Sequence, residues 1–555
     1  MERLGCLIGR KDDWGLFGRS TELKSWRSQT FEVLPALSVR RRELRYSLRT
    51  VTVAWMFGVA WMACTSGDQV RAFARMLGFN DFAFGLLGAL PFLATLGQLP
   101  AAIIIERTGL RKIPFIWWGT VHRLLWLAVA AVPLLLAPGL GAIVAVLSFL
   151  AVSNFLGAMA TPGWMTWMSD LIPRRIRGRY FARRALWSQR VQVVVVVLLS
   201  LALDAATVRG APEKFALQHA LMWTIGIIFA IGAILGAVDI LMFRRIREVM
   251  QPELPELPQP PTTSAISALR ELLVEPLKDR IFRSYVLYGA TITFTATFSG
   301  WYFWRNATEG LGFSKLGTNG LFMVIGPLAG NMAIRWWGRL QDRWGRRPVL
   351  IIATIGTCLS LVPWFFASPR LPSPGAFVDA VNWCWNHLGG GGMLLTAAMP
   401  VSAYLLGALG CVVGGISWGG VGLAQTGITL HFADGRGRSK YVAASAVLIS
   451  VGGAMGGLLG GVMVQSLEFL RAHPIMAGPF EWNQWHASFL VSLLVRILSM
   501  VWLVNMPDPG ARPVRYVLRY MTANVSNAVS SWLFYPLRVF GWGRDDTAGH
   551  RNEKN

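Results

Sequence analysis

Apolar runs long enough to cross a bilayer recur along almost the whole chain, and they restrict its possible folds more than any other feature. A run of about 18 or more apolar residues is typical of a transmembrane helix. Of the 555 residues, 54% are hydrophobic and 15% are charged, whereas soluble globular chains carry about 25% charge. The sequence therefore predicts an all-α polytopic protein that crosses the membrane many times.

The apolar runs form two sets of six, separated by the proline-rich polar stretch EVMQPELPELPQPPTTS. The first set covers 48–68, 83–104, 113–136, 141–167, 185–206 and 219–243. The second set covers 283–304, 317–337, 348–367, 396–429, 441–466 and 485–505. We expect twelve transmembrane helices in two bundles, with an N-terminal tail at 1–46, bundles at 47–247 and 281–506, a linker at 248–280 and a C-terminal tail at 507–555.

The net charge of +24 indicates membrane orientation and not a nucleic-acid partner. Arginines cluster after the second, fourth, sixth, eighth and tenth runs, and the opposite loops are nearly bare. Arginine and lysine hold short loops on the cytoplasmic side of a membrane. We therefore expect a bacterial inner-membrane protein whose termini and linker are cytoplasmic. In the C-terminal tail, Val517, Met521 and Val525 have helical spacing, which predicts an amphipathic helix on the cytoplasmic leaflet.

The two halves of the chain repeat each other. Pro91 precedes Glu106 by 15 positions, and Pro327 precedes Asp342 by the same interval. The tripeptide LGF stands upstream of each proline. This pattern indicates one six-helix unit that has been duplicated in parallel orientation.

Between the eighth and ninth runs stands GRLQDRWGRRPVL, at 338–350. It matches the signature G-x-L-x-D-R-x-G-R-R-x-x-L of the major facilitator superfamily, and a partial copy, AIIIERTGLRK, lies at 102–112. The chain resembles that superfamily over about residues 45–505, and the run that begins LGFNDFAFG resembles a group of uncharacterised bacterial transporters within it. The resemblance implies two pseudo-symmetric six-helix bundles and transport by alternating access.

The same motif supplies a predicted cytoplasmic gate. In the resembling family this cluster holds the cytoplasmic side shut in the outward-open state, and the alternative is a static topology signal. Its leading glycine should allow close helix contact, its second glycine a tight turn, and its carboxylate a cap on a neighbouring helix. The predicted gate residues are Gly338, Asp342, Arg343, Gly345, Arg346, Arg347, Glu106, Arg107, Gly109, Arg111, Asp170 and Asp434.

Polar residues deep in the apolar runs mark candidate positions for a substrate cavity, because they are costly in lipid. Arg123 and Arg496 lie near mid-membrane, where each would receive an anionic group of a solute or pair with a buried group. Acids are scarce at that depth, so we expect no carboxylate partner for Arg123. The other cavity candidates, for which helix packing is the alternative, are Asn154, Tyr288, Gln425 and Trp418.

Asp68, at the far end of the first run, is the candidate for proton coupling if burial raises its pKa. The alternative is that it caps the edge of its helix. Asp204 and Asp239 lie near the ends of runs, and we expect them to be structural. The glycines that recur every fourth residue from Gly452 predict tight helix contact in the eleventh run.

These features favour a secondary active transporter of a small solute, driven by a proton gradient and working as a monomer in the lipid bilayer. No phosphate-binding G-x(4)-G-K-[ST] motif is present, so we do not expect ATP to drive it. We expect no cofactor and no metal. The alternatives are an exporter of lipophilic compounds or a lipid mover, and a non-transporting receptor with this fold. A membrane-embedded enzyme is disfavoured because the histidines are scattered through different segments.

Overall fold

The computed structural model describes residues 41–172, 174–208, 214–246, 248, 274–387, 399–432, 438–504 and 506. The predicted C-terminal amphipathic helix and Asp434 lie outside these residues. The side chains of Glu106, Arg107 and Asp170 are not described either.

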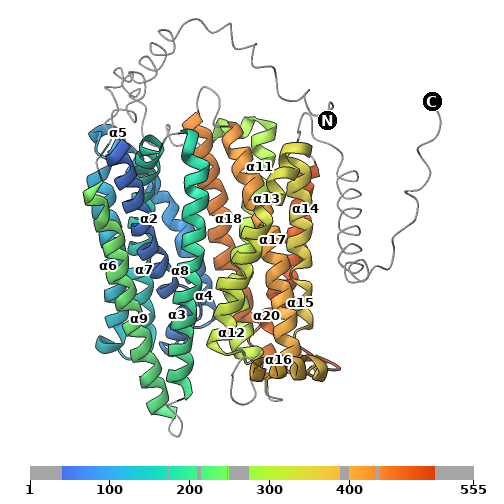
Figure 1. Cartoon of the computed structure of the whole chain (residues 1–555). Helices are drawn as coiled ribbons and strands as arrows, with labels where there is room; N and C mark the ends of the chain where they lie inside the picture. Colours follow the sequence, from blue (N-terminus) through green and yellow to red (C-terminus); the bar gives the residue numbers. More distant parts are fainter. Residues whose placement is uncertain are drawn as a thin grey trace, which may run out of the picture. The chain divides into compact units, whose positions relative to one another are not determined.

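The helices pack into two compact units (Figure 1). Unit 1 contains the helices that precede the linker, together with Ser314–Asn319. Its elements are α2 (Arg41–Cys64), α3 (Asp68–Met76), α4 (Asp81–Ala94), η3 (Thr95–Gly97), α5 (Gln98–Thr108), α6 (Lys112–Leu135), α7 (Leu140–Leu171), α8 (Arg174–Val208), α9 (Lys214–Met242), η4 (Phe243–Arg245) and α12 (Lys315–Asn319).

Unit 2 contains Leu269–Phe313 and the chain from Gly320 onward. Its helices are η5 (Pro276–Lys278), α11 (Arg280–Arg305), η6 (Asn306–Gly310), η7 (Gly320–Ile325), α13 (Gly326–Trp344), α14 (Arg346–Leu359), α15 (Val362–Phe366), α16 (Gly375–His387), α17 (Val401–Phe432), α18 (Arg438–Ser466), α19 (Phe469–Ala472) and α20 (Gln484–Val504). A small antiparallel hairpin pairs β1 (Ile475–Ala477) with β2 (Phe480–Trp482).

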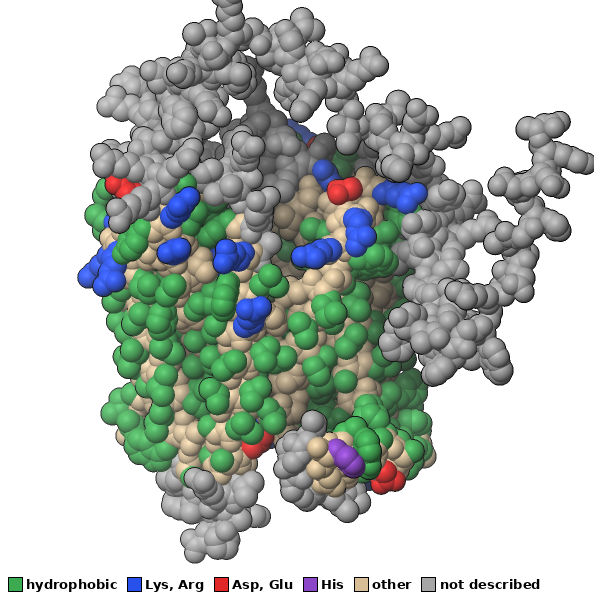
Figure 2. All heavy atoms as spheres, in the orientation of Figure 1, with side chains coloured by type: hydrophobic (Ala, Val, Ile, Leu, Met, Phe, Trp, Pro, Cys, Tyr) green, Lys and Arg blue, Asp and Glu red, His purple; other side chains and the backbone are tan. Residues whose placement is uncertain are grey.

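Ten helices in the described part of the chain are long and apolar enough to cross a membrane. The seventh and eighth predicted spans are helical as well, as α11 and as the run from α12 through η7 to α13. Threonine, tyrosine and glycine dilute the apolar residues of α11, which is why its composition alone does not mark it as a span. In each unit the helix sides visible in Figure 2 carry mainly hydrophobic side chains, and Lys and Arg gather toward one end.

The two units use the same helix pairings, as expected for a duplicated bundle. In unit 1, α2 packs on α8 and α9, and α6 packs on α7 and α9. In unit 2, the corresponding α11 packs on α18 and α20, and α14 packs on α17 and α20. The all-α, two-bundle architecture predicted from the apolar runs is therefore confirmed.

Three helix boundaries differ from the sequence-based expectation. The first helix ends at Cys64, because the chain turns at Gly67 with a φ of 89°, and Asp68 therefore starts α3. The basic segment from Arg174, expected as a loop, is the first part of α8, since arginine is a good helix former. A further helix, α16, lies between the ninth and tenth predicted spans.

Glycines set how closely the helices of unit 2 approach one another. A Cβ atom added at Gly452, Gly456 or Gly460 would collide with carbonyl oxygens of α11, so the predicted tight contact of the eleventh span is confirmed. A Cβ atom at Gly338 meets nothing within 4 Å in the described chain, so the close approach predicted there remains a prediction. The backbones of α13 and α17 meet at Gly330, whose added Cβ would lie 2.8 Å from the Gly415 carbonyl oxygen.

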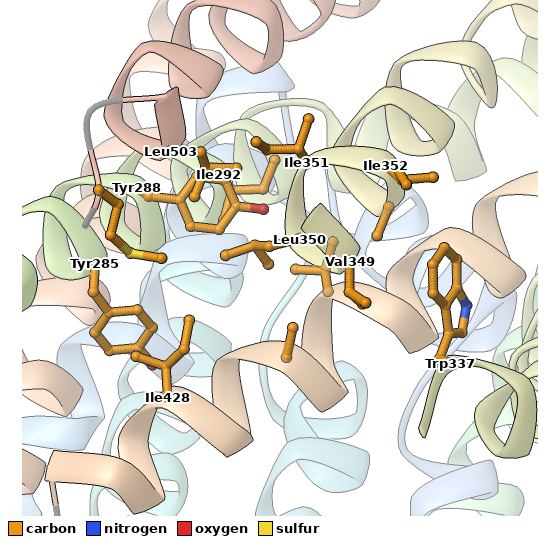
Figure 3. Packing of buried hydrophobic residues seen from close by; sticks show 14 of the residues in the cluster. Tyr285, Tyr288, Ile292, Trp337, Val349, Leu350, Ile351, Ile352, Ile428 and Leu503 are labelled. Carbon is orange, nitrogen blue, oxygen red and sulfur yellow. The ribbon is translucent and has the colours of Figure 1, made fainter. Parts of the chain in front are cut away.

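One apolar core of unit 2 is built from α11, α13, α14, α17, α18 and α20 (Figure 3). Tyr288 is completely buried there, and its hydroxyl lies 2.7 Å from the Thr354 hydroxyl. Trp337, Leu350 and Leu503 belong to the same cluster. This packing joins α14 to α20, the helix that also carries Arg496.

Candidate functional site

A cavity of about 560 Å³ lies in unit 1 and has charged residues in its lining. Residues of α2, α4, α5, α6, α7, α8 and α9 line it, and they include Arg123, Arg184 and Asp239. Arg123, Arg184 and Asp239 are only 8%, 7% and 3% exposed, respectively. Because charged groups in a membrane protein are costly unless they face a cavity or a partner, this cluster is the first candidate for a functional site.

Arg123 already has a partner in this cavity. Its Nη2 donates to Asp239 Oδ2 at 3.4 Å, and its guanidinium carbon lies 3.4 Å from the centre of the Trp61 ring. The expectation that no acid would reach Arg123 is wrong, since α9 brings Asp239 to α6 from far along the chain. In this structure Asp239 holds the arginine.

Two glycines make room for this pair. A Cβ atom at Gly58 would lie 2.5 Å from Asp239 Oδ2. A Cβ atom at Gly236 would lie 2.7 Å from the Trp61 ring and 2.8 Å from Arg123 Cδ. The stacked arginine and its carboxylate therefore fit only because α2 and α9 lack side chains at these positions.

Histidine and asparagine side chains complete one wall of the cavity. His122 Nδ1 lies 2.8 Å from the Ser153 hydroxyl, and the His122 ring meets the Trp61 ring edge to face at 5.1 Å. Asn154 also lines the cavity, and its amide donates to the Leu150 carbonyl oxygen at 2.8 Å. This wall contains both aromatic surface and hydrogen-bonding groups.

A second cavity, of about 460 Å³, lies inside unit 2 and contains Arg496 and Trp418. Arg496 is 3% exposed. Its Nη1 donates to the Thr357 carbonyl oxygen at 2.6 Å, and its Nε donates to the Thr295 hydroxyl at 3.3 Å. The hydrogen bonds shown for this arginine in the described chain thus go to neutral oxygens.

The internal repeat places the two cavities at matching positions. Pro91 lines the cavity of unit 1, and its counterpart Pro327 lines that of unit 2. One helical turn further on, Thr95 and Asn331 line the same two cavities. The duplicated unit therefore contains a cavity whose polar lining differs between its two copies.

Two of the six cavity candidates do not line either cavity. Tyr288 is buried in the apolar core of unit 2 and bonds Thr354. Gln425 is absent from the lining of both cavities. Its backbone oxygen is 3.4 Å from the Tyr285 hydroxyl, so Gln425 lies on the core side of α17.

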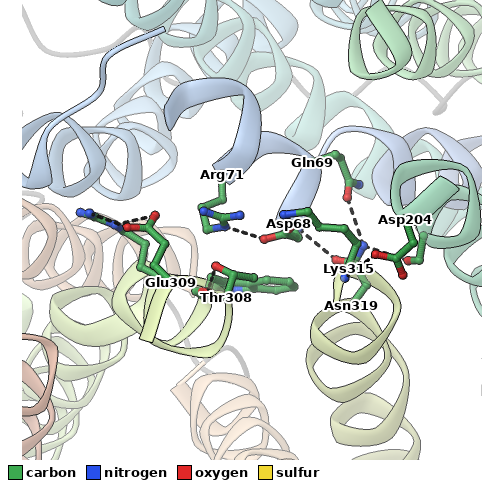
Figure 4. Close-up of polar contacts among 11 residues, drawn as sticks. Asp68, Gln69, Arg71, Asp204, Thr308, Glu309, Lys315 and Asn319 are labelled. Carbon is green, nitrogen blue, oxygen red and sulfur yellow. Dashed lines mark hydrogen bonds and ion pairs between the residues drawn. The ribbon is translucent and has the colours of Figure 1, made fainter. Parts of the chain in front are cut away.

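Asp68 lies in a separate polar cluster of unit 1 (Figure 4). Its carboxylate is completely buried and contacts Arg71 Nε at 2.5 Å and Lys315 Nζ at 3.0 Å. Burial alone would raise the pKa of Asp68, but the two cations outweigh it and hold the pKa below its ordinary value of 3.8. The raised pKa on which the proton-coupling role of Asp68 depends is therefore not found in this arrangement. Asp68 instead lies at the amino end of α3, where a negative charge is favourable, as in the capping alternative.

The short helix α12 is fixed to this cluster by its backbone and by Asn319. Asp204 accepts the backbone N–H groups of Lys315 and Leu316 at 2.9 and 3.0 Å, which caps the helix. Asn319 accepts the backbone N–H of Asp68 at 3.0 Å and donates to the Ser200 hydroxyl at 3.0 Å. Asp204 thus has the structural role expected for it.

The signature motif ends α13 in the predicted tight turn. Gly345 has a φ of 93°, and Gly109 ends α5 in the left-handed region with a φ of 66°. Asp342 and Arg343 are exposed, Arg346 is half-buried, and Arg347 Nη2 donates to the Val504 carbonyl oxygen at 2.6 Å. The gating role of these residues remains a prediction.

A carboxylate does cap a neighbouring helix near the first copy of the motif, but it comes from outside that motif. Glu248 Oε1 accepts the backbone N–H groups of Arg111 and Lys112 at 3.1 and 3.2 Å, at the start of α6. A negative charge at this position stabilises the helix. Nothing in the spacing of the motif points to Glu248, which follows the sixth span.

Residues 48–385 match the family model described as Major Facilitator Superfamily. A search of curated proteins finds no match. Among solved structures, a bacterial homologue of the human lysosomal transporter Spinster, inward-facing and occupied, has a TM-score of 0.55 at 13% identity, covering 85% of this chain and 100% of its own.

Two further solved structures have the same fold. The nucleoside transporter NupG has a TM-score of 0.53 at 14% identity, covering 83% of this chain and 99% of its own. A D-xylose–proton symporter has a TM-score of 0.53 at 13% identity, covering 84% of this chain and 98% of its own. At such identities the similarity shows the fold alone.

Proposed function

The chain belongs to the Major Facilitator Superfamily, and we propose on that basis that it is a secondary active transporter that moves a small solute by alternating access. The observation that carries this proposal is the cavity of unit 1 with its charged lining, in a bundle whose side visible in Figure 2 is mainly apolar. Such a cavity suits a polar solute that must be shielded from lipid. We also propose a bacterial inner-membrane location, with cytoplasmic termini, and a monomer.

A proton gradient is the proposed driving force. The buried carboxylate of Asp239 lines the cavity of unit 1 and lies beside the guanidinium of Arg123. Protonation of Asp239 would release Arg123 and change which contacts stabilise the unit. The D-xylose–proton symporter that shares this fold supports the same assignment by analogy.

The test is a screen of labelled solutes with purified protein in liposomes, with and without an imposed pH gradient. The proposal expects one class of solute to accumulate only when the gradient is present, together with proton movement seen by a pH-sensitive dye inside the vesicles. Accumulation unaffected by the gradient would contradict proton coupling. A complete screen with no flux of any solute would contradict transport itself.

A second candidate function, movement of a lipophilic compound, is favoured by one observation. A cavity of about 590 Å³ in unit 1 is lined by apolar residues of α3, α6 and α9, such as Leu127, Trp223 and Ile227. An alkyl chain would fit such a lining. The same screen therefore includes lipophilic amines and short-chain phospholipids, whose selective movement would favour this candidate over a polar solute.

A further inference from the structure

The charged groups that line the cavity of unit 1 do not balance. Two arginines, Arg123 and Arg184, line it together with a single carboxylate, Asp239. Asp239 pairs with Arg123. A buried charge without a counter-ion is costly in a low-dielectric interior. The described lining therefore lacks one negative charge.

Arg184 carries the unbalanced charge. Its residue is 7% exposed, and its Nε is buried without a hydrogen-bond partner. The guanidinium carbon lies 4.3 Å from the Trp55 ring and 5.4 Å from the Trp164 ring. Arg184 also interacts electrostatically with Asp239, but no direct ion pair joins the two in the described chain. Its close contacts are with aromatic faces, which leave its N–H groups available for an acceptor.

Further donors on the lining have no acceptor either. The buried Trp61 Nε1 and Arg123 Nε lack hydrogen-bond partners in the described chain. Both residues line the same cavity as Arg184. Three donors from α2, α6 and α8 are thus available for a group that accepts hydrogen bonds and carries negative charge.

We propose that Arg184 binds the carboxylate or phosphate group of a small anionic solute, whose apolar part packs on Trp55 and Trp164. This proposal rests on the proposed transport function, because it names the class of solute that the cavity of unit 1 receives. Arginine suits this role, since its planar fork binds both groups with two parallel hydrogen bonds. Arg123, already held by Asp239, is a second donor to the same anion.

The first experiment compares benzoate with benzamide on the purified full-length protein. The two probes have nearly the same size and shape and differ in charge. Benzoate should raise the Tm of the wild-type protein as its concentration rises, and benzamide should not, because binding to the folded state stabilises it. Succinate and inorganic phosphate are tested in the same way. Equal stabilisation by benzoate and benzamide would overturn the proposal, and so would a lack of stabilisation by all three anions, regardless of how the variants behave.

The second experiment uses Arg184→Gln, Arg184→Lys and the matched control Arg190→Gln. Arg190 lies on the same helix and also stacks on a tryptophan, Trp187, but it is exposed. Arg184→Gln should weaken benzoate binding at least about tenfold, as expected for loss of a charge-assisted hydrogen bond. Arg184→Lys should retain part of the affinity, and Arg190→Gln should bind like the wild type.

The Tm without ligand separates this role from a purely structural one. If Arg184 only packs its aromatic neighbours, Arg184→Gln should lower that Tm and leave the shift with benzoate unchanged, which would overturn the proposal. If Arg184 is a binding residue, removal of an uncompensated charge should leave the Tm without ligand unchanged or raise it. The shift with benzoate should then be lost.

Two further measurements show whether the anion is a lipid or a soluble solute, and whether a negative result concerns the site or transport itself. Stabilisation by nanodiscs that contain phosphatidylglycerol, relative to phosphatidylcholine, without any response to soluble anions would assign the site to lipid and overturn the solute proposal. If benzoate binds but no anion crosses the liposome membrane, the transport proposal is wrong and the anion-binding site stands.

If a neutral solute is transported and Arg184→Gln leaves its flux unchanged, the transport proposal stands and the anion-binding site is wrong.

Discussion

The ammonium of Lys315 lies 3.0 Å from the carboxylate of Asp68, which is completely buried and also contacts Arg71. One carboxylate therefore neutralises two cations, one on α3 and one on α12. Lys315 belongs to a six-residue segment that packs with unit 1, although it follows α11 in the sequence.

Removal of the Asp68 charge should destabilise the protein strongly. Asp68→Asn leaves Arg71 and Lys315 without their shared counter-ion, and loss of one partner of a buried pair costs about 3–5 kcal/mol. Thermal unfolding of purified protein measures this. As a control, Arg370→Gln removes an exposed ion pair with Glu481 and should cost less than about 1 kcal/mol. Equal Tm values for both variants would show that the Asp68 pairs contribute little.

The same carboxylate predicts how stability depends on pH. The pKa of Asp68 is lowered in the folded protein, so its contribution is fully present above the ordinary value of 3.8 and is lost as the pH falls through the lower folded value. The difference in Tm between wild type and Asp68→Asn should therefore be constant at neutral pH and shrink below about pH 4. A difference that grew in acid would reverse the sign of the assigned shift.

The Arg123–Asp239 pair predicts strong coupling between two substitutions. Asp239→Asn and Arg123→Gln should each destabilise the protein, because each leaves the other charge buried. The double variant should lose less stability than the two single losses added together, by about 1–3 kcal/mol in a double-mutant cycle. If Arg123 also contacts the solute, Arg123→Gln should weaken binding more than Arg123→Lys. Additive single losses would mean that the two groups do not interact.

The close contact between α11 and α18 predicts that one methyl group added at Gly456 destabilises the protein. Gly456→Ala places a Cβ atom against the Phe294 carbonyl oxygen and should cost about 1–3 kcal/mol. Gly422→Ala is the matched control, since an added Cβ there meets nothing within 4 Å and alanine favours a helix by up to about 1 kcal/mol. Thermal unfolding compares the two variants. If Gly456→Ala leaves the Tm unchanged, α11 and α18 can move apart at little cost.

Cys384 offers a test of membrane orientation. It is exposed on α16, whereas the other described cysteines, Cys64, Cys358 and Cys411, are buried. In a Cys6→Ser background, an impermeant maleimide added to intact cells should label Cys384, because the loop after the ninth span is predicted to face outward. An Asp342→Cys variant that also carries Cys6→Ser and Cys384→Ser should react with the maleimide only after the cells are permeabilised. The reverse pattern would overturn the predicted topology.

The gate assignment predicts a change in rate without a change in insertion. Asp342→Asn removes a charge that is exposed in this structure and should slow transport while the protein still inserts. A charge-assisted interaction of about 1.5–3 kcal/mol in the outward-open state would change the population of that state more than tenfold. Asp379→Asn, an exposed acid on α16, is the control. Wild-type rates for Asp342→Asn would reduce the motif to a topology signal.

The sequence predicted the fold well because its two strongest signals are local. Apolar runs mark helices without reference to any other part of the chain, and the turn at Gly345 follows from the signature motif itself. The partner of Arg123 could not be predicted in this way, because Asp239 comes from another helix and the depth of a residue says nothing about its neighbours. Arg184 was hidden for a different reason. It ends a basic segment that is typical of a cytoplasmic loop, and only the early start of α8 turns its side chain into the bundle.

Gly58 and Gly236 make the tolerance of two backbone positions depend on the Arg123–Asp239 pair. In the present geometry a Cβ atom at position 58 presses on Asp239 Oδ2, and one at position 236 presses on Trp61 and Arg123. A side chain at either position therefore requires the pair or its aromatic neighbour to shift. Substitutions at 58 and 236 should consequently be tolerated better in a chain that has already lost the pair than in one that keeps it.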